Sequence, residues 1–123
     1  MELRLYAKGE KVAYIPKWKG QRELAERGEI ADPVVAVIAP LTRGELKRYL
    51  RATSGEELYD VAGELFGEHV LEIKNLSIGG RRVESGRQLW EFEDAPPEVE
   101  ELVFELLNAI LDSSTLSEGE LKK

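Results

Sequence analysis

The sequence contains no cysteine and only one histidine, His69. The absence of cysteine excludes disulfide cross-links and thiolate chemistry. A single imidazole excludes any metal site that needs several histidines. No apolar run approaches the roughly 18–20 residues that a membrane-spanning helix requires, and the amino-terminal segment lacks the apolar core of a signal peptide. We therefore expect a cytoplasmic protein.

Basic residues are missing from a long stretch near the C-terminal end. Between Arg87 and Lys122 the chain has ten Asp or Glu residues and no Lys or Arg, within a formal net charge of −7. Non-specific nucleic-acid binding depends on cationic patches, so this balance argues against nucleic acid as a partner. The segregated acidic charge either steers a basic partner toward the chain or keeps a helical surface soluble.

The length and composition fit one globular domain with a modest core. The chain has 123 residues, of which 42% are hydrophobic and 33% are charged, which is typical of a folded protein. We expect a single α+β domain over residues 1–112 and a short tail over 113–123. The predicted elements are strands at about 2–7, 11–15 and 34–39, helices at about 43–53 and 55–66, a β-hairpin-like segment at about 70–84 and an amphipathic helix at about 97–112.

Local signals support these boundaries. Thr42 with Glu45 and Ser54 with Glu57 have the spacing of capping boxes that begin helices, and Gly67 is placed to end the second helix. Gly79-Gly80 is typical of a tight hairpin turn. The β-branched run 34–38 is typical of a strand buried on both faces.

The last helix has a wide apolar stripe that could bind a partner. Its apolar residues recur at helical spacing, and an exposed stripe of this kind could cover a partner helix. The alternative is that the same residues belong to the core of the protein itself. The candidate partner-binding residues are Val99, Val103, Leu106, Leu107 and Ile110.

We find no residue set that would carry catalysis, so we do not expect an enzyme. Glutamates lie near His69, but three or four ligands would be needed for a metal site, and we predict neither a metal nor a cofactor. One local cluster could contact nucleic acid, or it could simply hold the chain onto the domain. That cluster is Tyr14, Lys17, Trp18, Lys19 and Arg22.

The order of four short motifs resembles a known family. Tyr14-Ile15-Pro16-Lys17 comes first, and a Val-rich strand ends in Ala39-Pro40-Leu41-Thr42-Arg43-Gly44-Glu45. A later helix opens with Ala95-Pro96-Pro97-Glu98, and the chain closes with Ser113-Ser114-Thr115-Leu116-Ser117-Glu118-Gly119-Glu120-Leu121-Lys122. In this order the motifs resemble those of the tail assembly chaperone-like proteins of long-tailed bacteriophages, with residues 53–93 departing most from the pattern.

The resemblance implies a non-enzymatic role in viral morphogenesis. Such proteins are thought to bind the tape measure protein, a long helical rod, and to keep it soluble during tail assembly. The resemblance also implies self-association and a location in the host cytoplasm, not as a stable part of the virion. From the charge balance and the lack of a long apolar run, we expect no membrane or nucleic-acid partner. Two alternatives stay open: a minor tail or connector subunit of the virion, and an acidic adaptor that binds a basic protein.

Overall fold

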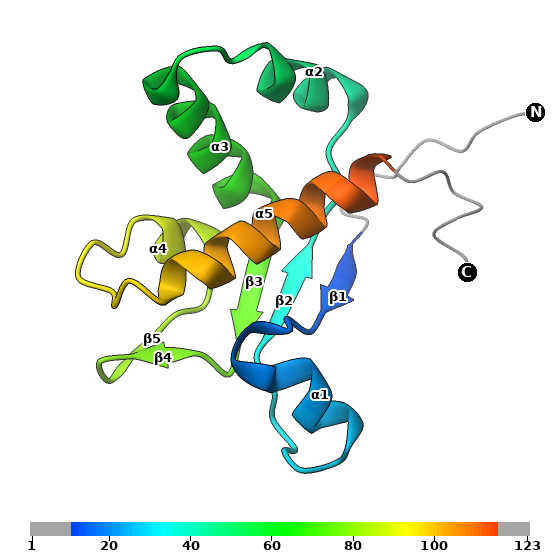
Figure 1. The fold of residues 1–123 in the computed structure, drawn as a ribbon, viewed down its shortest axis with the longest axis vertical. Helices are drawn as coiled ribbons and strands as arrows, with labels where there is room; N and C mark the ends of the chain where they lie inside the picture. Colours follow the sequence, from blue (N-terminus) through cyan, green and yellow to red (C-terminus); the bar gives the residue numbers. More distant parts are fainter. Residues whose placement is uncertain (1–10, 116–123) are drawn as a thin grey trace, which may run out of the picture.

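A computed structural model describes the backbone of residues 11–115 and the side chains of residues 11–112. Over this range a three-stranded antiparallel sheet carries helices on one face, and a two-stranded ribbon lies next to it (Figure 1). The predicted α+β class is confirmed. The predicted strand 2–7 and residues 116–123 of the predicted tail lie outside the described residues.

The sheet has the order β1-β2-β3, with β1 at Val12–Tyr14, β2 at Val35–Ile38 and β3 at Val70–Lys74. The predicted strands at 11–15 and 34–39 are therefore confirmed. In β2, Ala36 and Ile38 are buried, whereas Val35 and Val37 are only half-buried. The prediction that this strand is buried on both faces was wrong, because in the described part of the chain the helices cover one face of the sheet.

The helices α2 (Arg43–Arg51) and α3 (Gly55–His69) begin where the capping signals predicted. The Glu45 amide donates to the Thr42 hydroxyl at 3.3 Å, and the Thr42 amide donates to the Glu45 carboxylate at 2.9 Å. At the start of α3, the hydroxyl of Ser54 accepts from the Glu57 amide at 3.0 Å. The bonds at Thr42 are reciprocal, whereas Ser54 makes one bond, and both caps satisfy amides that have no partner inside a helix.

The predicted end of α3 at Gly67 was wrong. Gly67 lies inside the helix, where a Cβ would come within 3.5 Å of the Arg87 side chain. The helix continues to His69, and β3 begins at the next residue, Val70. Gly67 does not have the positive φ of a left-handed helix stop, and a Cβ there would make only an ordinary contact with Arg87.

The hairpin-like segment divides into two parts. Residues 70–74 form β3 and pair with β2, whereas β4 (Ser77–Ile78) pairs with β5 (Arg81–Arg82). Gly79 and Gly80 both have positive φ, at 58° and 82°, as the tight turn requires. A short helix that the sequence analysis did not predict, α4 (Gly86–Trp90), follows this ribbon.

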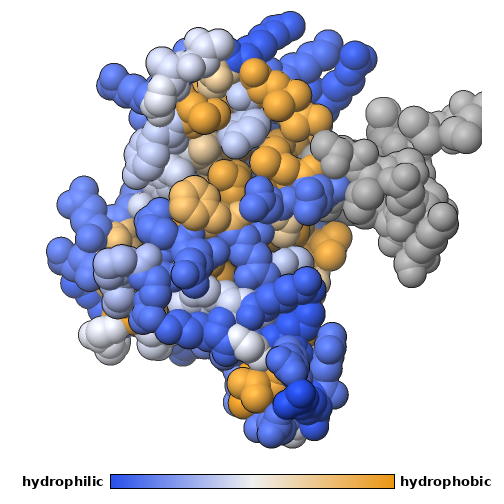
Figure 2. Space-filling model, in the orientation of Figure 1, coloured by the Kyte–Doolittle hydropathy of each residue, from blue (hydrophilic) through white to orange (hydrophobic). Residues whose placement is uncertain are grey.

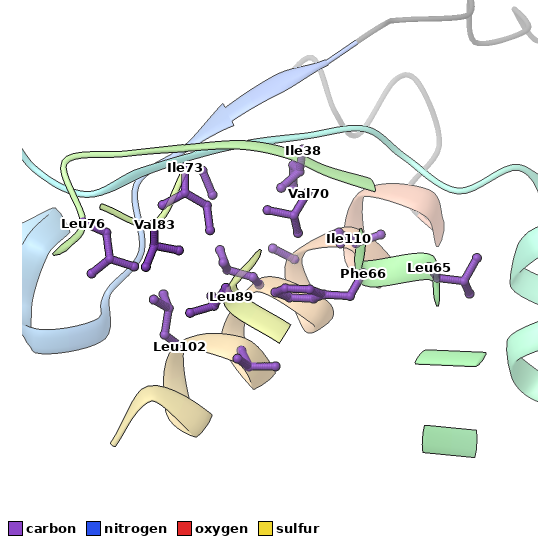
Figure 3. Close-up of a cluster of buried hydrophobic side chains, with 14 of the residues drawn as sticks. Ile38, Leu65, Phe66, Val70, Ile73, Leu76, Val83, Leu89, Leu102 and Ile110 are labelled. Atoms are coloured by element: carbon purple, nitrogen blue, oxygen red, sulfur yellow. The ribbon is translucent and has the colours of Figure 1, made fainter. Parts of the chain in front are cut away.

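The last helix, α5 (Val99–Thr115), runs across the covered face of the sheet (Figure 1). Figure 3 shows side chains from the sheet pointing toward those of α3, α4 and α5. A short 3₁₀ turn, η1 (Trp18–Gly20), and α1 (Gln21–Glu26) connect β1 to β2. The largest fully buried side chains are Phe66, Ile38, Leu65, Leu102, Leu106, Ile110, Val70, Val83 and Pro16. None of the helices in the described range has the length and apolar character that would let it span a bilayer.

Candidate functional site: an apolar groove between the helices

The structure places most of the predicted partner-binding stripe in the core of the chain. Val99, Val103, Leu106 and Ile110 are all buried, because they face the sheet and α3. They present little surface to a partner, so the interpretation of the stripe as core holds for these four residues, although Val103 also lines part of the groove described next. Leu107 differs, since it is half-buried and faces an open groove.

This groove lies among α2, α3, α4 and α5 and has a volume of about 240 Å³. Two aromatic side chains that line it are largely exposed: Tyr59 by 61% and Phe104 by 60%. Figure 2 shows apolar side chains gathered over the region between these helices. The residues that line the groove are Tyr49, Gly55, Leu58, Tyr59, Ala62, Trp90, Glu100, Val103, Phe104 and Leu107.

One wall of the groove is built on a close contact between α3 and α4. A Cβ on Gly63 would lie 2.4 Å from the indole nitrogen of Trp90, so only glycine lets the indole pack against α3 at this point. The Trp90 ring then contacts Phe66 at a centroid distance of 5.5 Å and Tyr59 at 4.9 Å. These tilted aromatic pairs hold Tyr59 at the surface.

The α2 wall packs only partly against the core. No residue of α2 is buried, although Leu46, Tyr49 and Ala52 pack against the edge of the core. Arg48 forms a hydrogen-bonded ion pair with Glu64 of α3 at 2.5 Å. A helix with an apolar face but no buried residue leaves part of that face to the groove.

His69 connects the end of α3 to the start of α2. Its Nδ1 lies 3.0 Å from the carbonyl oxygen of Ala39, and its Nε2 lies 2.8 Å from Glu45. Both partners are acceptors when Glu45 is ionised, so both nitrogens donate only in the imidazolium form. Burial acts to raise the pKa of the Glu45 carboxyl, but hydrogen bonds from Thr42 and His69 outweigh it and hold that pKa below its usual value.

Glu45, His69 and Glu68 are also the one cluster of potential metal ligands that we find among the described residues. Their candidate ligand atoms lie within 4.8 Å of one another. A metal ion would have to take the place of the hydrogen bond between Glu45 and His69 and would disturb the cap of α2. The arrangement thus fits a structural contact between α2 and α3 better than a metal centre.

The candidate nucleic-acid cluster is tied to the acidic face of α5. Glu105 accepts hydrogen bonds from the Tyr14 hydroxyl at 2.7 Å, the Lys17 amide at 2.7 Å and the Trp18 amide at 3.0 Å. Burial, followed by the hydrogen bond and the negative charge of Glu105, raises the pKa of the Tyr14 phenol. The guanidinium of Arg22 lies over the Tyr14 ring at 4.9 Å. These side chains thus hold the chain onto the domain, as the alternative interpretation expected.

Glu98 provides a second anchor for the same segment. The Trp18 indole donates to the Glu98 carbonyl oxygen at 3.0 Å, and Lys19 forms an ion pair with the Glu98 carboxylate. Part of the acidic charge that precedes and begins α5 is therefore used within the chain.

Sequence reasoning missed the groove because its walls come from four separate elements. The sequence does contain a signal for one of these elements, α4: Ser85 and Gln88 have the spacing of a capping box. In the structure the Ser85 hydroxyl accepts a hydrogen bond from the Gln88 amide at 3.1 Å. Apart from two tyrosines, Glu100 is the one ionisable residue lining the groove. The site thus offers apolar and aromatic surface for binding.

The chain matches no family model, no curated protein and no solved structure.

Proposed function

We propose that this protein is a tail assembly chaperone of a long-tailed bacteriophage. It binds the tape measure protein and keeps this long helical partner soluble while the tail assembles around it. The observation that carries the proposal is the apolar groove, whose lip exposes Tyr59 and Phe104 by 61% and 60%. Exposed apolar surface of this kind is suited to an amphipathic helix that lies along a groove.

The positions of the resembling motifs support this proposal. Tyr14 and Lys17, from the first motif, bind Glu105 on α5. Glu45, from the second, caps α2. Glu98, from the third, accepts from the indole of Trp18. The motifs that carry the resemblance thus fix α2 and α5, which are two walls of the groove.

The acidic surface has a separate role in the proposed function. Residues 88–112 contain eight Asp or Glu and no Lys or Arg. Like charge on the outside of a coated partner opposes aggregation. The chaperone acts in the host cytoplasm without catalysis, associates with itself and leaves before the virion is complete.

Co-expression with the tape measure protein of the same phage tests the proposal. Wild-type protein is expected to raise the soluble fraction of the tape measure protein and to co-purify with it. The double variant Tyr59→Ser/Phe104→Ser is expected to lose both effects while remaining folded. The control is Leu71→Ser, because Leu71 is 41% exposed on β3 and does not line the groove. The proposal is wrong if the tape measure protein is equally soluble with and without the wild-type chain and the two do not co-purify.

An adaptor that binds a basic protein is the second candidate, and the acidic stretch 88–112 favours it. Such an adaptor would keep its partner when Tyr59 and Phe104 are replaced and would lose it when the surface acids are neutralised.

Mass spectrometry of purified phage particles tests the other alternative, a tail or connector subunit. A subunit would occur at a fixed copy number, whereas a chaperone would be absent or scarce.

A further inference from the structure

We infer that an aromatic pocket beside the groove binds the guanidinium group of an arginine on the partner helix. The pocket lies where α4 leads into α5 (Figure 1), and Tyr59, Trp90 and Phe92 line it. The inference rests on the proposed function, because it takes the partner to be a helix that lies in the groove. It adds the side chain by which that partner is recognised.

The aromatic pocket shares part of its wall with the groove. Tyr59, Trp90, Glu100 and Val103 line both of them. The pocket has a volume of about 170 Å³, whereas one turn of an α-helix with its side chains fills about 500 Å³. The pocket is therefore large enough for the end of one side chain and too small for a stretch of helix.

The aromatic lining favours a cation as the occupant. The face of an aromatic ring attracts a positive charge that lies within about 6 Å of its centre, and tryptophan attracts it most strongly. Tyr59 and Trp90 lie together, with their ring centroids 4.9 Å apart. The chain itself places a cation over the third ring, because the Arg81 guanidinium lies 5.0 Å from the centroid of Phe92. Arg81 lines a neighbouring depression with Asp94 and does not line the aromatic pocket.

Two carboxylates give the aromatic pocket a negative charge. Glu93 and Glu100 line it and are exposed, and neither forms an ion pair with another residue in the described range. The amino-terminal end of α5 opposes a cation here, since its dipole is equivalent to about half a positive charge. Two full negative charges outweigh this half charge, so the balance favours a cation.

Arginine suits this combination of rings and carboxylates better than lysine. Its guanidinium group is planar, stacks on aromatic rings and donates to carboxylates in a fixed fork, and it is more weakly hydrated than an ammonium group. In the aromatic pocket it would contact the rings and the carboxylates together. The partner segment is therefore a helix with an apolar stripe and an arginine beside that stripe.

Labelled peptides that share one leucine stripe provide the test. Each carries a single arginine at a different position beside the stripe, and the arginine that gives the tightest binding is then replaced with lysine or citrulline. Citrulline has nearly the shape of arginine but no charge. Exposed ion pairs and a cation–π contact contribute up to about fivefold each. Fluorescence anisotropy is therefore expected to show arginine binding about tenfold more tightly than citrulline, with lysine between them.

Variants of the protein assign this preference to the aromatic pocket. Glu93 lines the pocket but not the groove, and Glu93→Gln/Glu100→Gln is expected to reduce the preference for arginine to about twofold, the part due to the rings. The control Glu26→Gln/Glu72→Gln makes the same change in net charge at exposed positions that line neither site, and it should keep the full preference. Phe104 lines the groove but not the pocket, so Phe104→Ser should weaken all the peptides alike.

The outcomes separate this inference from the proposed function. If the arginine and citrulline peptides bind equally and Phe104→Ser weakens both, the inference is wrong and the groove remains a docking site. If no peptide binds, both the inference and the groove as a docking site are wrong. A preference for arginine that survives Glu93→Gln/Glu100→Gln would place the cation elsewhere and overturn the inference. A dimer of the protein alone that Phe104→Ser dissociates in sedimentation would make a second copy the occupant, which also overturns it.

Discussion

Replacing Glu105 with alanine should destabilise the protein more than its position on an acidic helix face suggests. The carboxylate accepts three hydrogen bonds, from the Tyr14 hydroxyl and from the amides of Lys17 and Trp18. A hydrogen bond to a charged group contributes about 1.5–3 kcal/mol. Glu105 is only half-buried and water can reach the exposed Lys17 amide, so we expect a total loss of about 2–4 kcal/mol instead of the full sum.

Urea unfolding at pH 7, followed by far-UV circular dichroism, measures this loss. The matched control is Glu101→Ala, which removes an exposed carboxylate one turn earlier on α5 and should change stability by less than about 0.5 kcal/mol. In a double-mutant cycle, Tyr14→Phe and Glu105→Gln should show a coupling of about 1 kcal/mol. Equal losses for Glu105→Ala and Glu101→Ala would refute the reasoning, since the anchor would then contribute nothing beyond general charge.

Three further predictions concern other parts of the fold. Glu45→Gln should cost about 1–2 kcal/mol near pH 7. Because the folded pKa of Glu45 is lowered, this difference is present above its unfolded pKa of about 4.3 and should vanish as the pH falls through the folded pKa, as urea titrations at several pH values would show. Gly63→Ala should destabilise the protein by about 1–3 kcal/mol despite the better helix propensity of alanine, because the new Cβ would lie 2.4 Å from the indole nitrogen of Trp90. The control Gly44→Ala, whose nearest contact would be at 4.0 Å, should be neutral or stabilising, as thermal melts would show. Leu106→Ala should cost about 2–5 kcal/mol, and the exposed Phe104→Ala less than about 1 kcal/mol; equal losses in urea unfolding would contradict the assignment of core and surface on α5.

The parts of the fold that were predicted correctly depend on signals within a few residues. The cap at Thr42 and Glu45, the start of α3 at Ser54 and the turn at Gly79-Gly80 each need only neighbouring side chains and backbone groups. These local rules hold because the same atoms that form the signal also make the bonds.

The errors occurred where the outcome depends on contacts between distant segments. A glycine near the end of an apolar pattern predicts a helix stop at Gly67, yet α3 continues to His69 and ends where β3 begins to pair with β2 at Val70. The β-branched run predicted that Val35 and Val37 would be buried, yet both are only half-buried. A β-branched composition does not show whether one or both faces of a sheet are covered.

The site was the least predictable feature. Helical periodicity identified the stripe on α5, but an apolar stripe has the same spacing whether it faces its own core or a partner. The structure assigns Val103 and Leu106 to the core and leaves Phe104 at the surface. The bond between Tyr14 and Glu105 joins residues 91 positions apart, a separation at which no local pattern applies.

The lack of any buried residue in α2 has a consequence for how the groove opens. Segments with few buried apolar contacts open at a lower free energy than the whole domain. The amides of α2 should therefore exchange with solvent deuterium by local opening, while those of β2 and β3 await global unfolding. One wall of the groove should thus unfold as a separate, less stable unit, because it is held by its N-terminal cap, the Arg48–Glu64 ion pair and the contacts of its apolar face.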